Sequence, residues 1–210
     1  MVAETRGARS RAQHLGPERR RPQVLDAALA IAVQDGIGAV NVGSVAAHLG
    51  VTRPVVYACF SDRVEMVEAL LDREGGALLD SMLDALHSTG GSPGPQEAFV
   101  QGFRSMLAAV AANPDPWRLM FTGAPDPAVS ARFRQAREHL KQRSTEWFRP
   151  AVLAWWQTPD LDRKLPVLIE LFLCSCEAAV RSFLAGVDGW TADELGEFMG
   201  LATCRAFEDA

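Results

Sequence analysis

The chain has 210 residues, 48% of them apolar and 22% charged, and it carries a formal net charge of −5. This length allows one large domain or a small module plus a larger one, and the composition supports a real hydrophobic core. The four cysteines have no CxxC spacing and the four histidines are dispersed, so zinc and haem signatures are excluded and we expect no metal and no cofactor.

Residues 1–21 are much more basic than the rest of the chain. They hold six arginines against two glutamates, a net charge of +4 that leaves −9 for the remaining residues. Because DNA phosphates respond to local positive potential, the acidic total does not exclude a nucleic-acid partner. We expect a flexible basic arm that aids DNA binding, with an ordinary disordered tail as the alternative.

Neither a signal peptide nor a membrane span is evident. The first 16 residues lack the apolar stretch of a signal peptide. The most apolar segment, 165–180, is too short to span a bilayer comfortably and contains one proline and two glutamates. We therefore expect a cytoplasmic protein without membrane contact.

Hydrophobic spacing and Pro/Gly punctuation predict an all-α chain of about nine helices. Pro22 opens the first helix, which ends near Gly36, and Asn41 caps the second. The third has Pro54 in its first turn, and Ser61 or Asp62 caps a long fourth helix that reaches about residue 87. The others are expected at 96–112, around 117–121, at 127–157 with a kink at Pro150 as an option, at 161–187 and at 191–207.

Residues 41–60 have the pattern of a helix-turn-helix, in which one helix braces the DNA backbone and the second enters the major groove. Ala46 is the small buried residue that the close approach of two helices needs. Gly50 can adopt the positive φ of a sharp turn. Val56 in the second helix faces the core, which leaves the other side chains of that helix for DNA.

Four side chains of this motif have clear chemistry for DNA. Arg53 can form a bidentate pair with guanine O6 and N7, and Val55 can touch a thymine methyl group. Tyr57 offers a hydroxyl to a phosphate, and Arg63 at the start of the fourth helix can reach the backbone. The alternatives are a solvated Arg53 and a Tyr57 at the rim of the small core.

Three linked segments, VLDAALAIAVQDG, NVGSVAAHLGVTRPVVYACF and SDRVEMVEALL, occupy the run from about Arg21 to Leu71. Their order and spacing resemble the DNA-binding domain of the tetracycline-repressor (TetR) family of bacterial regulators, over about a quarter of the chain. The resemblance implies phosphate contacts at Asn41, Thr52, Tyr57 and Arg63. It implies base readout at Arg53, Pro54 and Val55, with Gly43 and Ser44 near the groove.

The chain departs from the family pattern at individual contact positions. Cys59 stands where the family often has histidine, Gly43 replaces a longer polar residue, and Ala58 is small where bulkier side chains are common. These departures affect single contacts and leave the domain assignment unchanged. We expect a flexible arm at 1–21, a helix-turn-helix domain at 22–65 and a helical ligand-binding and dimerisation domain at 66–210.

In TetR-like proteins the larger helical domain dimerises and usually holds a small-molecule effector. The resemblance implies a four-helix bundle built from the last two helices of each subunit, and a roughly palindromic operator. Within the last helix Leu195, Phe198, Met199 and Ala202 recur at helical spacing. This stripe fits a subunit interface, which we favour, or the intrachain core.

Candidate effector contacts are mostly aromatic, because a small-molecule cavity needs apolar walls with a few polar groups. Glu170 and Glu177 are the only charges within 165–180 and share a helix face, so they need partners. Arg181 and arginines of 127–157 can pair with them, and recognition of a cationic effector is the alternative. The aromatic candidates, for each of which simple packing is the other interpretation, are Phe103, Trp117, Phe121, Phe133, Trp147 and Phe172; Glu170 and Glu177 are the charged candidates, with a structural ion pair as the other interpretation.

The sequence therefore predicts a homodimeric transcriptional repressor that binds a palindromic double-stranded DNA operator and is released by a small-molecule effector. Release would act through the fourth helix and needs a ligand that binds the non-DNA-binding arrangement more tightly. The alternative is a DNA-binding regulator or architectural protein without an effector. The chain contains no Gly-rich phosphate loop and no nucleophile elbow, so we do not expect an enzyme.

Overall fold

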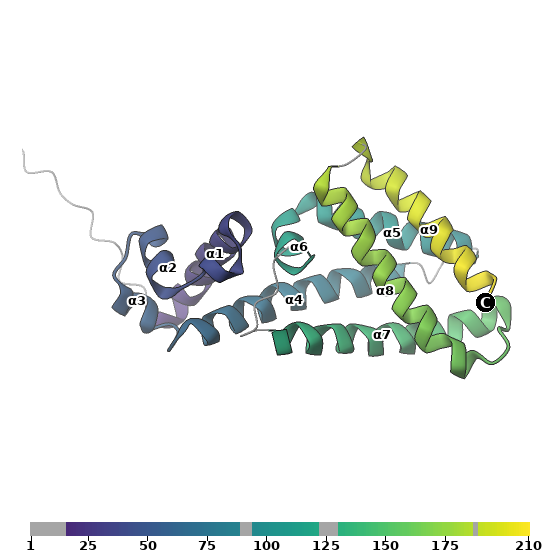
Figure 1. Ribbon diagram of the computed structural model, residues 1–210, viewed down its shortest axis with the longest axis horizontal. Helices are drawn as coiled ribbons and strands as arrows, with labels where there is room; N and C mark the ends of the chain where they lie inside the picture. Colours follow the sequence, from purple (N-terminus) through teal and green to yellow (C-terminus); the bar gives the residue numbers. More distant parts are fainter. Residues whose placement is uncertain (1–15, 89–93, 122–129, 187–188) are drawn as a thin grey trace, which may run out of the picture.

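The computed structural model describes residues 16–88, 94–121, 130–186 and 189–210. Within these ranges the chain forms nine α-helices, one short 3₁₀ helix and no strand, so the predicted all-α fold is confirmed. Figure 1 follows them in chain order: α1 (Pro17–Asp35), η1 (Ile37–Ala39), α2 (Val42–Leu49), α3 (Arg53–Tyr57), α4 (Arg63–Ser88), α5 (Pro95–Ala112), α6 (Pro114–Phe121), α7 (Ser130–Trp156), α8 (Leu161–Ala185) and α9 (Ala192–Glu208).

Helix α1 begins earlier than the sequence predicts, at Pro17 rather than at Pro22. Pro17 lies in the first turn, where a missing N–H breaks no helical bond. Arg21, assigned from sequence to the flexible arm, donates from Nη1 to the Cys59 carbonyl oxygen at 2.6 Å, and its guanidinium lies 4.1 Å from the Phe60 ring centre. These tertiary contacts hold the start of α1, so residues 17–21 belong to the helix, and residues 1–15 lie outside the described ranges.

Two further boundaries differ from the expectation. Pro114 was expected only to stop α5, but it also opens α6, because proline fits the first turn of a new helix as well as it ends the old one. Helix α7 is continuous across Pro150, and the structure describes it from Ser130 onward. The segment 127–129, expected to begin this helix, lies outside the described residues.

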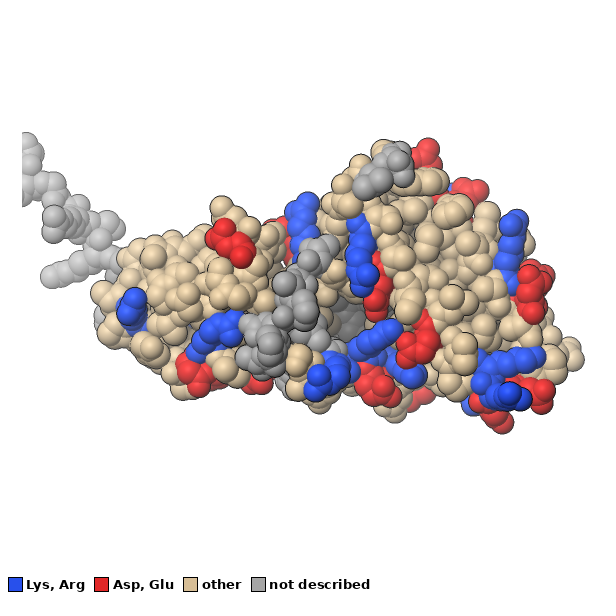
Figure 2. Space-filling view, in the orientation of Figure 1, with Lys and Arg blue, Asp and Glu red and all other residues tan. Residues whose placement is uncertain are grey.

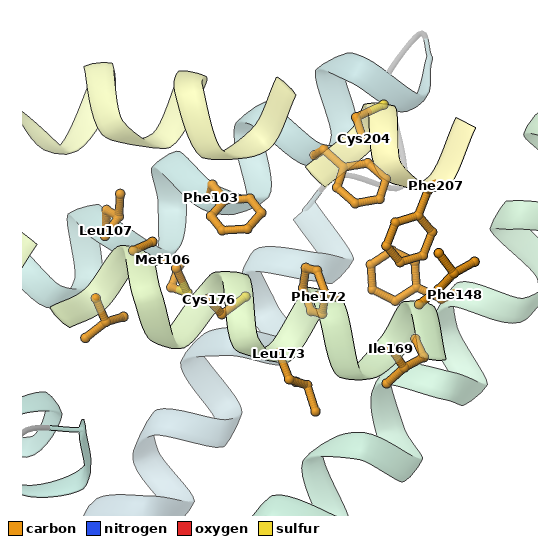
Figure 3. Close-up of a cluster of buried hydrophobic side chains, with 14 of the residues drawn as sticks. Phe103, Met106, Leu107, Phe148, Ile169, Phe172, Leu173, Cys176, Cys204 and Phe207 are labelled. Atoms are coloured by element: carbon orange, nitrogen blue, oxygen red, sulfur yellow. The ribbon is translucent and has the colours of Figure 1, made fainter. Parts of the chain in front are cut away.

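The buried apolar side chains form two separate cores. One lies among α1, α2, α3 and the first half of α4, and it includes Val24, Val45, Phe60 and Leu70. The other lies among α5, α7, α8 and α9 and is rich in aromatic rings (Figure 3). Helix α6 joins the two, because its Leu119 belongs to the first core and its Trp117 to the second; in Figure 1 it lies between α1 and α5.

Helices α5 and α9 pack so closely that two positions of α9 must be glycine. A Cβ atom on Gly200 would lie 2.6 Å from the Cα atom of Val100, and one on Gly196 would lie 2.8 Å from that of Arg104. The apolar stripe expected on this helix is therefore divided between two faces. Leu195 is buried, Met199 packs against the same core, and the remaining two members, Phe198 and Ala202, are exposed.

Among the residues that the structure describes, no helix combines the length and the apolar character needed to cross a membrane.

Candidate DNA-binding surface and ligand cavity

The predicted helix-turn-helix is present and its turn is locally determined. The Asn41 side chain caps α2 by accepting hydrogen bonds from the backbone N–H groups of Gly43 (2.9 Å) and Ser44 (3.0 Å). Gly50 ends α2 with a φ of 64°, a left-handed conformation that favours glycine. The Val51 N–H then donates to the Ala46 carbonyl oxygen at 2.9 Å, which turns the chain toward α3.

Helix α3 has one side buried in the N-terminal core and one side exposed to solvent. Val56 is fully buried, and Cys59 and Phe60 follow it into the N-terminal core. The opposite side is open to solvent: Tyr57 is 53% exposed, Val55 is half-buried, and Thr52, Arg53, Pro54 and Ala58 are exposed. The solvent-facing side of α3 therefore carries five of the predicted contact residues, Thr52, Arg53, Pro54, Val55 and Tyr57.

Arg53 lies against the beginning of α2. A Cβ atom on Gly43 would come within 3.2 Å of Arg53 Nη2 and 3.1 Å of Asn41 Oδ1. Both distances are tighter than ordinary contacts, so a larger residue at position 43 would displace the guanidinium or the cap. Gly43, which from sequence looked like a lost contact, makes room for Arg53.

The Arg63 side chain donates hydrogen bonds to the protein backbone. Its Nε donates to the Val40 carbonyl oxygen at 2.8 Å and its Nη2 to that of Ile37 at 3.0 Å. These bonds tie the start of α4 to η1, the turn that delivers Asn41 to its capping position. The side chain thus has a structural role that the sequence did not suggest.

The beginning of α4 is capped by neighbouring side chains. Asp62 accepts from the Glu65 N–H at 2.9 Å, and Glu65 accepts from the backbone N–H (2.7 Å) and the hydroxyl (2.8 Å) of Ser61. The hydrogen bonds from Ser61 hold the pKa of Glu65 below its ordinary value. Of the two caps left open by the sequence, Asp62 is the residue directly before the helix.

Cys59, which stands where the related family often has histidine, faces inward. Its thiol donates toward the carbonyl oxygens of Val55 (3.5 Å) and Pro17 (3.6 Å). Burial raises the pKa of this thiol above its ordinary value. Cys59 therefore packs the end of α3 against α1 rather than facing the surface that carries Tyr57.

A cavity lies between α5, α7 and α8 in the C-terminal core. It leaves about 30 Å³ for the centre of a water-sized sphere. Figure 3 labels three of its lining residues, Phe103 from α5, Phe148 from α7 and Phe172 from α8, with the Phe172 ring between the other two. The complete lining is Ala98, Phe99, Gly102, Phe103, Met106, Leu140, Ser144, Trp147, Phe148, Phe172 and Cys176.

Three of the residues proposed from sequence as effector contacts line this cavity: Phe103, Trp147 and Phe172. Trp117 and Phe121 do not; their rings stack on each other in α6, with centres 5.8 Å apart. Phe133 lies among the residues whose side chains the structure does not describe.

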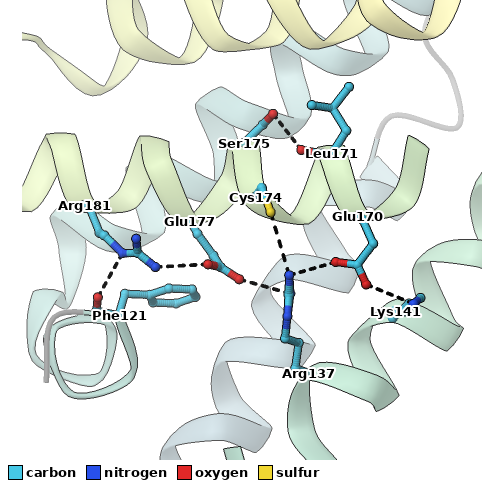
Figure 4. Close-up of polar contacts among 9 residues, drawn as sticks. All are labelled: Phe121, Arg137, Lys141, Glu170, Leu171, Cys174, Ser175, Glu177 and Arg181. Carbon is cyan, nitrogen blue, oxygen red and sulfur yellow. Dashed lines mark hydrogen bonds and ion pairs between the residues drawn. The ribbon is translucent and has the colours of Figure 1, made fainter. Parts of the chain in front are cut away.

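Glu170 and Glu177 also lie outside the cavity lining, in an ion-pair network between α7 and α8 (Figure 4). Arg137 bridges them, at 2.9 Å from Glu170 and 3.1 Å from Glu177. Lys141 adds a second bond to Glu170 at 2.9 Å, and Arg181 adds one to Glu177 at 3.0 Å. The partners that the sequence suggested for these carboxylates are thus present.

The network pairs three basic side chains with two carboxylates, and in Figure 2 basic and acidic side chains lie next to each other over α7 and α8. Chiefly the hydrogen bond from Lys141 holds the pKa of Glu170 below its ordinary value, and the same bond raises the pKa of Lys141. Both groups are therefore charged near neutral pH, and each is paired with the other at 2.9 Å.

The remaining residues of the lining were missed by the sequence reasoning. Two of them, Phe99 and Met106, share a face of α5 with the predicted Phe103 at helical spacing, which was a usable signal. Ser144 and Cys176 gave none, because a single serine or cysteine in a helical pattern does not reveal whether it faces a cavity or the packed core.

Residues 24–70 match the family described as bacterial regulatory proteins, tetR family. The chain is 29% identical over 134 residues to the HTH-type transcriptional activator FasR of Mycolicibacterium smegmatis, covering 63% of this chain and 60% of FasR, so it spans less than two thirds of that relative. The HTH-type transcriptional regulator AlkX of Mycobacterium tuberculosis is 29% identical over 155 residues, which cover 73% of this chain and 72% of AlkX. Residues 24–70 of this chain therefore form a DNA-binding domain of the TetR type.

Solved structures extend the TetR-family likeness to the C-terminal helices as a matter of fold. A TetR-like transcriptional regulator from Rhodococcus sp. RHA1 aligns with a TM-score of 0.69 at 16% identity, covering 89% of this chain and 94% of that structure. The fatty acid degradation regulator FadR from Bacillus halodurans aligns with a TM-score of 0.70 at 12% identity, covering 96% and 97%. The TetR-like arrangement therefore includes both cores and the helix that joins them.

Proposed function

We propose that this protein is a homodimeric transcriptional repressor, which binds a palindromic DNA operator through α2 and α3 and is released by a small molecule held in the C-terminal core. The observation that carries the DNA-binding part is the two-sided α3, whose buried Val56 anchors it while Arg53 and Tyr57 are exposed. A short helix fixed in this way can enter the major groove without losing its own packing.

Within this surface the residues take different roles. Arg53, Pro54 and Val55 read base edges, with Arg53 pairing to guanine. Asn41, Thr52 and Tyr57 contact phosphates, and Gly43 and Ser44 lie near the groove. Arg63 supports this surface by holding η1, since its Nε and Nη2 already donate to backbone carbonyls.

The dimer forms through the outward faces of α8 and α9. Val167 is 69% exposed and Leu171, one turn along α8, is also exposed, while Phe198 on α9 is 56% exposed. Phe198 stacks on the exposed ring of Trp190, with centres 5.7 Å apart. Large apolar side chains at helical spacing on two adjacent helices are what a two-fold bundle would cover.

The effector acts on DNA binding through α4 and α6. Asp26 of α1 pairs with Arg73 of α4 at 2.7 Å, which couples the N-terminal domain to the long helix. Leu119 and Trp117 of α6 belong to different cores, and Arg181 of α8 donates to the Phe121 carbonyl oxygen at 3.2 Å. A ligand between α5, α7 and α8 that prefers one arrangement of these helices shifts the spacing of the two recognition helices.

Fluorescence anisotropy with DNA from upstream of the protein's own gene tests this function. We expect salt-sensitive binding to a roughly palindromic segment. Arg53→Ala should weaken specific binding by roughly 1–3 kcal/mol and relax discrimination at one base pair per half-site. Arg143→Ala, which removes an exposed α7 arginine paired with Glu146, is the matched control and should bind normally. Unchanged discrimination in the Arg53 variant would remove the base-reading assignment.

A further inference from the structure

Ser144 has an unusual hydroxyl. The side chain is 0% exposed, it lines the cavity, and its Oγ finds no hydrogen-bond partner among the described residues. Buried serines and threonines in helices commonly donate to the carbonyl oxygen four residues earlier. Thr145, its neighbour, does so to Lys141 at 2.8 Å, and Ser175 does so to Leu171 at 2.8 Å. An unsatisfied buried hydroxyl is costly, which points to a bonding partner supplied from the cavity.

The rest of the cavity lining disfavours a charged ligand. Its other walls are apolar or aromatic apart from the Cys176 thiol, whose pKa is raised by burial, so that it stays protonated. The nearby cations and carboxylates of α7 and α8 are paired with each other through Arg137. A charged group in the cavity would lose its hydration without gaining a counterion, so the occupant is uncharged.

The size of the cavity limits the occupant to a compact molecule. Space of about 30 Å³ for the centre of a water-sized sphere leaves room for a compact molecule and not for a long chain. Apolar protein cavities accept single rings such as benzene. The rings of Phe103 and Phe148 both meet Phe172 nearly edge to face, which leaves ring edges and faces available to an aromatic guest.

We propose that the cavity binds an uncharged molecule of about one six-membered ring that carries a single hydroxyl or carbonyl group, and that the Ser144 hydroxyl forms a hydrogen bond with that group. This inference deepens the proposed function by naming the chemical class of the effector, and it rests on that function only for the effect on DNA binding.

The test uses the full chain and three probes of matched size: phenol, benzene and benzoate. By titration calorimetry we expect phenol to bind about three- to tenfold more tightly than benzene, because of one added hydrogen bond, and benzoate to bind at least tenfold more weakly than phenol. In Ser144→Ala the affinity for phenol should fall to that for benzene, while the affinity for benzene is unchanged. Ser105→Ala, which removes an exposed hydroxyl on α5, is the matched control and should keep the preference for phenol.

A second measurement separates a ligand anchor from a structural serine. Because the Ser144 hydroxyl makes no bond within the described chain, Ser144→Ala without ligand should melt at the same temperature as the natural protein or higher. A clear loss of stability in this variant, absence of binding by phenol and benzene, or a preference for phenol that survives Ser144→Ala would each overturn the proposal. If the natural protein binds phenol but binds no operator DNA, the proposed function is wrong and this inference still holds.

Discussion

The guanidinium of Arg63 donates from Nε to the carbonyl oxygen of Val40, 2.8 Å away and 23 residues earlier in the chain. Together with the bond to Ile37, this contact fixes the turn before α2. Arg63 sits where the family resemblance implies a phosphate contact. In the structure its Nε and Nη2 donate to backbone carbonyl oxygens, so its substitution should affect stability as well as DNA affinity.

We therefore predict that Arg63→Lys, which keeps the charge but loses the planar fork, lowers the free energy of unfolding by about 1–3 kcal/mol. Urea denaturation measures this, with Arg149→Lys at an exposed ion pair on α7 as the control. DNA affinity should fall by the same factor for operator and unrelated DNA. Full stability together with a salt slope reduced by about one would instead identify Arg63 as a simple phosphate contact.

The glycines of α9 give a second prediction. Gly200→Ala would bring a methyl group to 2.6 Å from Val100 Cα and force α5 and α9 apart, so unfolding free energy should fall by roughly 1–3 kcal/mol. Gly76→Ala is the matched change in α4, where nothing lies within 4 Å of the new carbon, and it should stabilise by about 0.5–1 kcal/mol. If Gly200→Ala were as stabilising as Gly76→Ala, the close α5–α9 packing would be wrong.

Acidic substitutions on the proposed interface should dissociate the dimer. Val167→Glu combined with Phe198→Glu should convert the protein to a monomer in sedimentation equilibrium, because both exposed side chains would face the same two-fold bundle. Operator affinity should fall at the same time, since one recognition helix loses its partner. Leu153→Glu, a comparably exposed position on α7, should leave the dimer intact. A dimer that survives the double substitution would exclude this face.

Stability should depend on pH through Glu65. Its pKa is held below the ordinary value of 4.5 by the hydrogen bonds from Ser61, so the ionised form stabilises the fold. That contribution is complete above pH 4.5 and is lost as the pH falls through the lower folded-state value. Urea denaturation from pH 7 to pH 3 should therefore find that Glu65→Gln is destabilising at neutral pH and much less so in acid. A difference that stays constant across this range would contradict the capping role.

The four cysteines should differ in reactivity. Cys174 is exposed, whereas Cys59, Cys176 and Cys204 are buried. Burial raises the pKa of Cys204 to about 11 and raises those of the other two buried thiols as well. In the native protein at pH 8, a thiol reagent should modify one cysteine quickly and three only on unfolding. Cys174→Ser should abolish the fast phase, and a remaining fast phase would show that one of the buried sites opens readily.

Local patterns were enough for the N-terminal module. Helical spacing, the cap at Asn41 and the left-handed Gly50 are properties of neighbouring residues, and each was predicted from the sequence and is present. The same holds for the pairing of Glu177 with Arg181, four residues apart on one helix. The early start of α1 was missed because the contacts that hold Arg21 come from residues near position 60.

The sequence by itself therefore determined the all-α architecture, the helix-turn-helix and the exposed chemistry of α3, since these follow from periodicities and turn residues within short segments. Only the tertiary structure decided that Arg63 holds a turn, that Gly43 makes room for Arg53, and that Gly200 belongs to an intrachain contact. It also brought Phe103, Ser144 and Phe172 from three helices around one cavity. Such relationships depend on how helices pack across long stretches of chain, and a pattern along one helix does not specify which neighbour its face will meet.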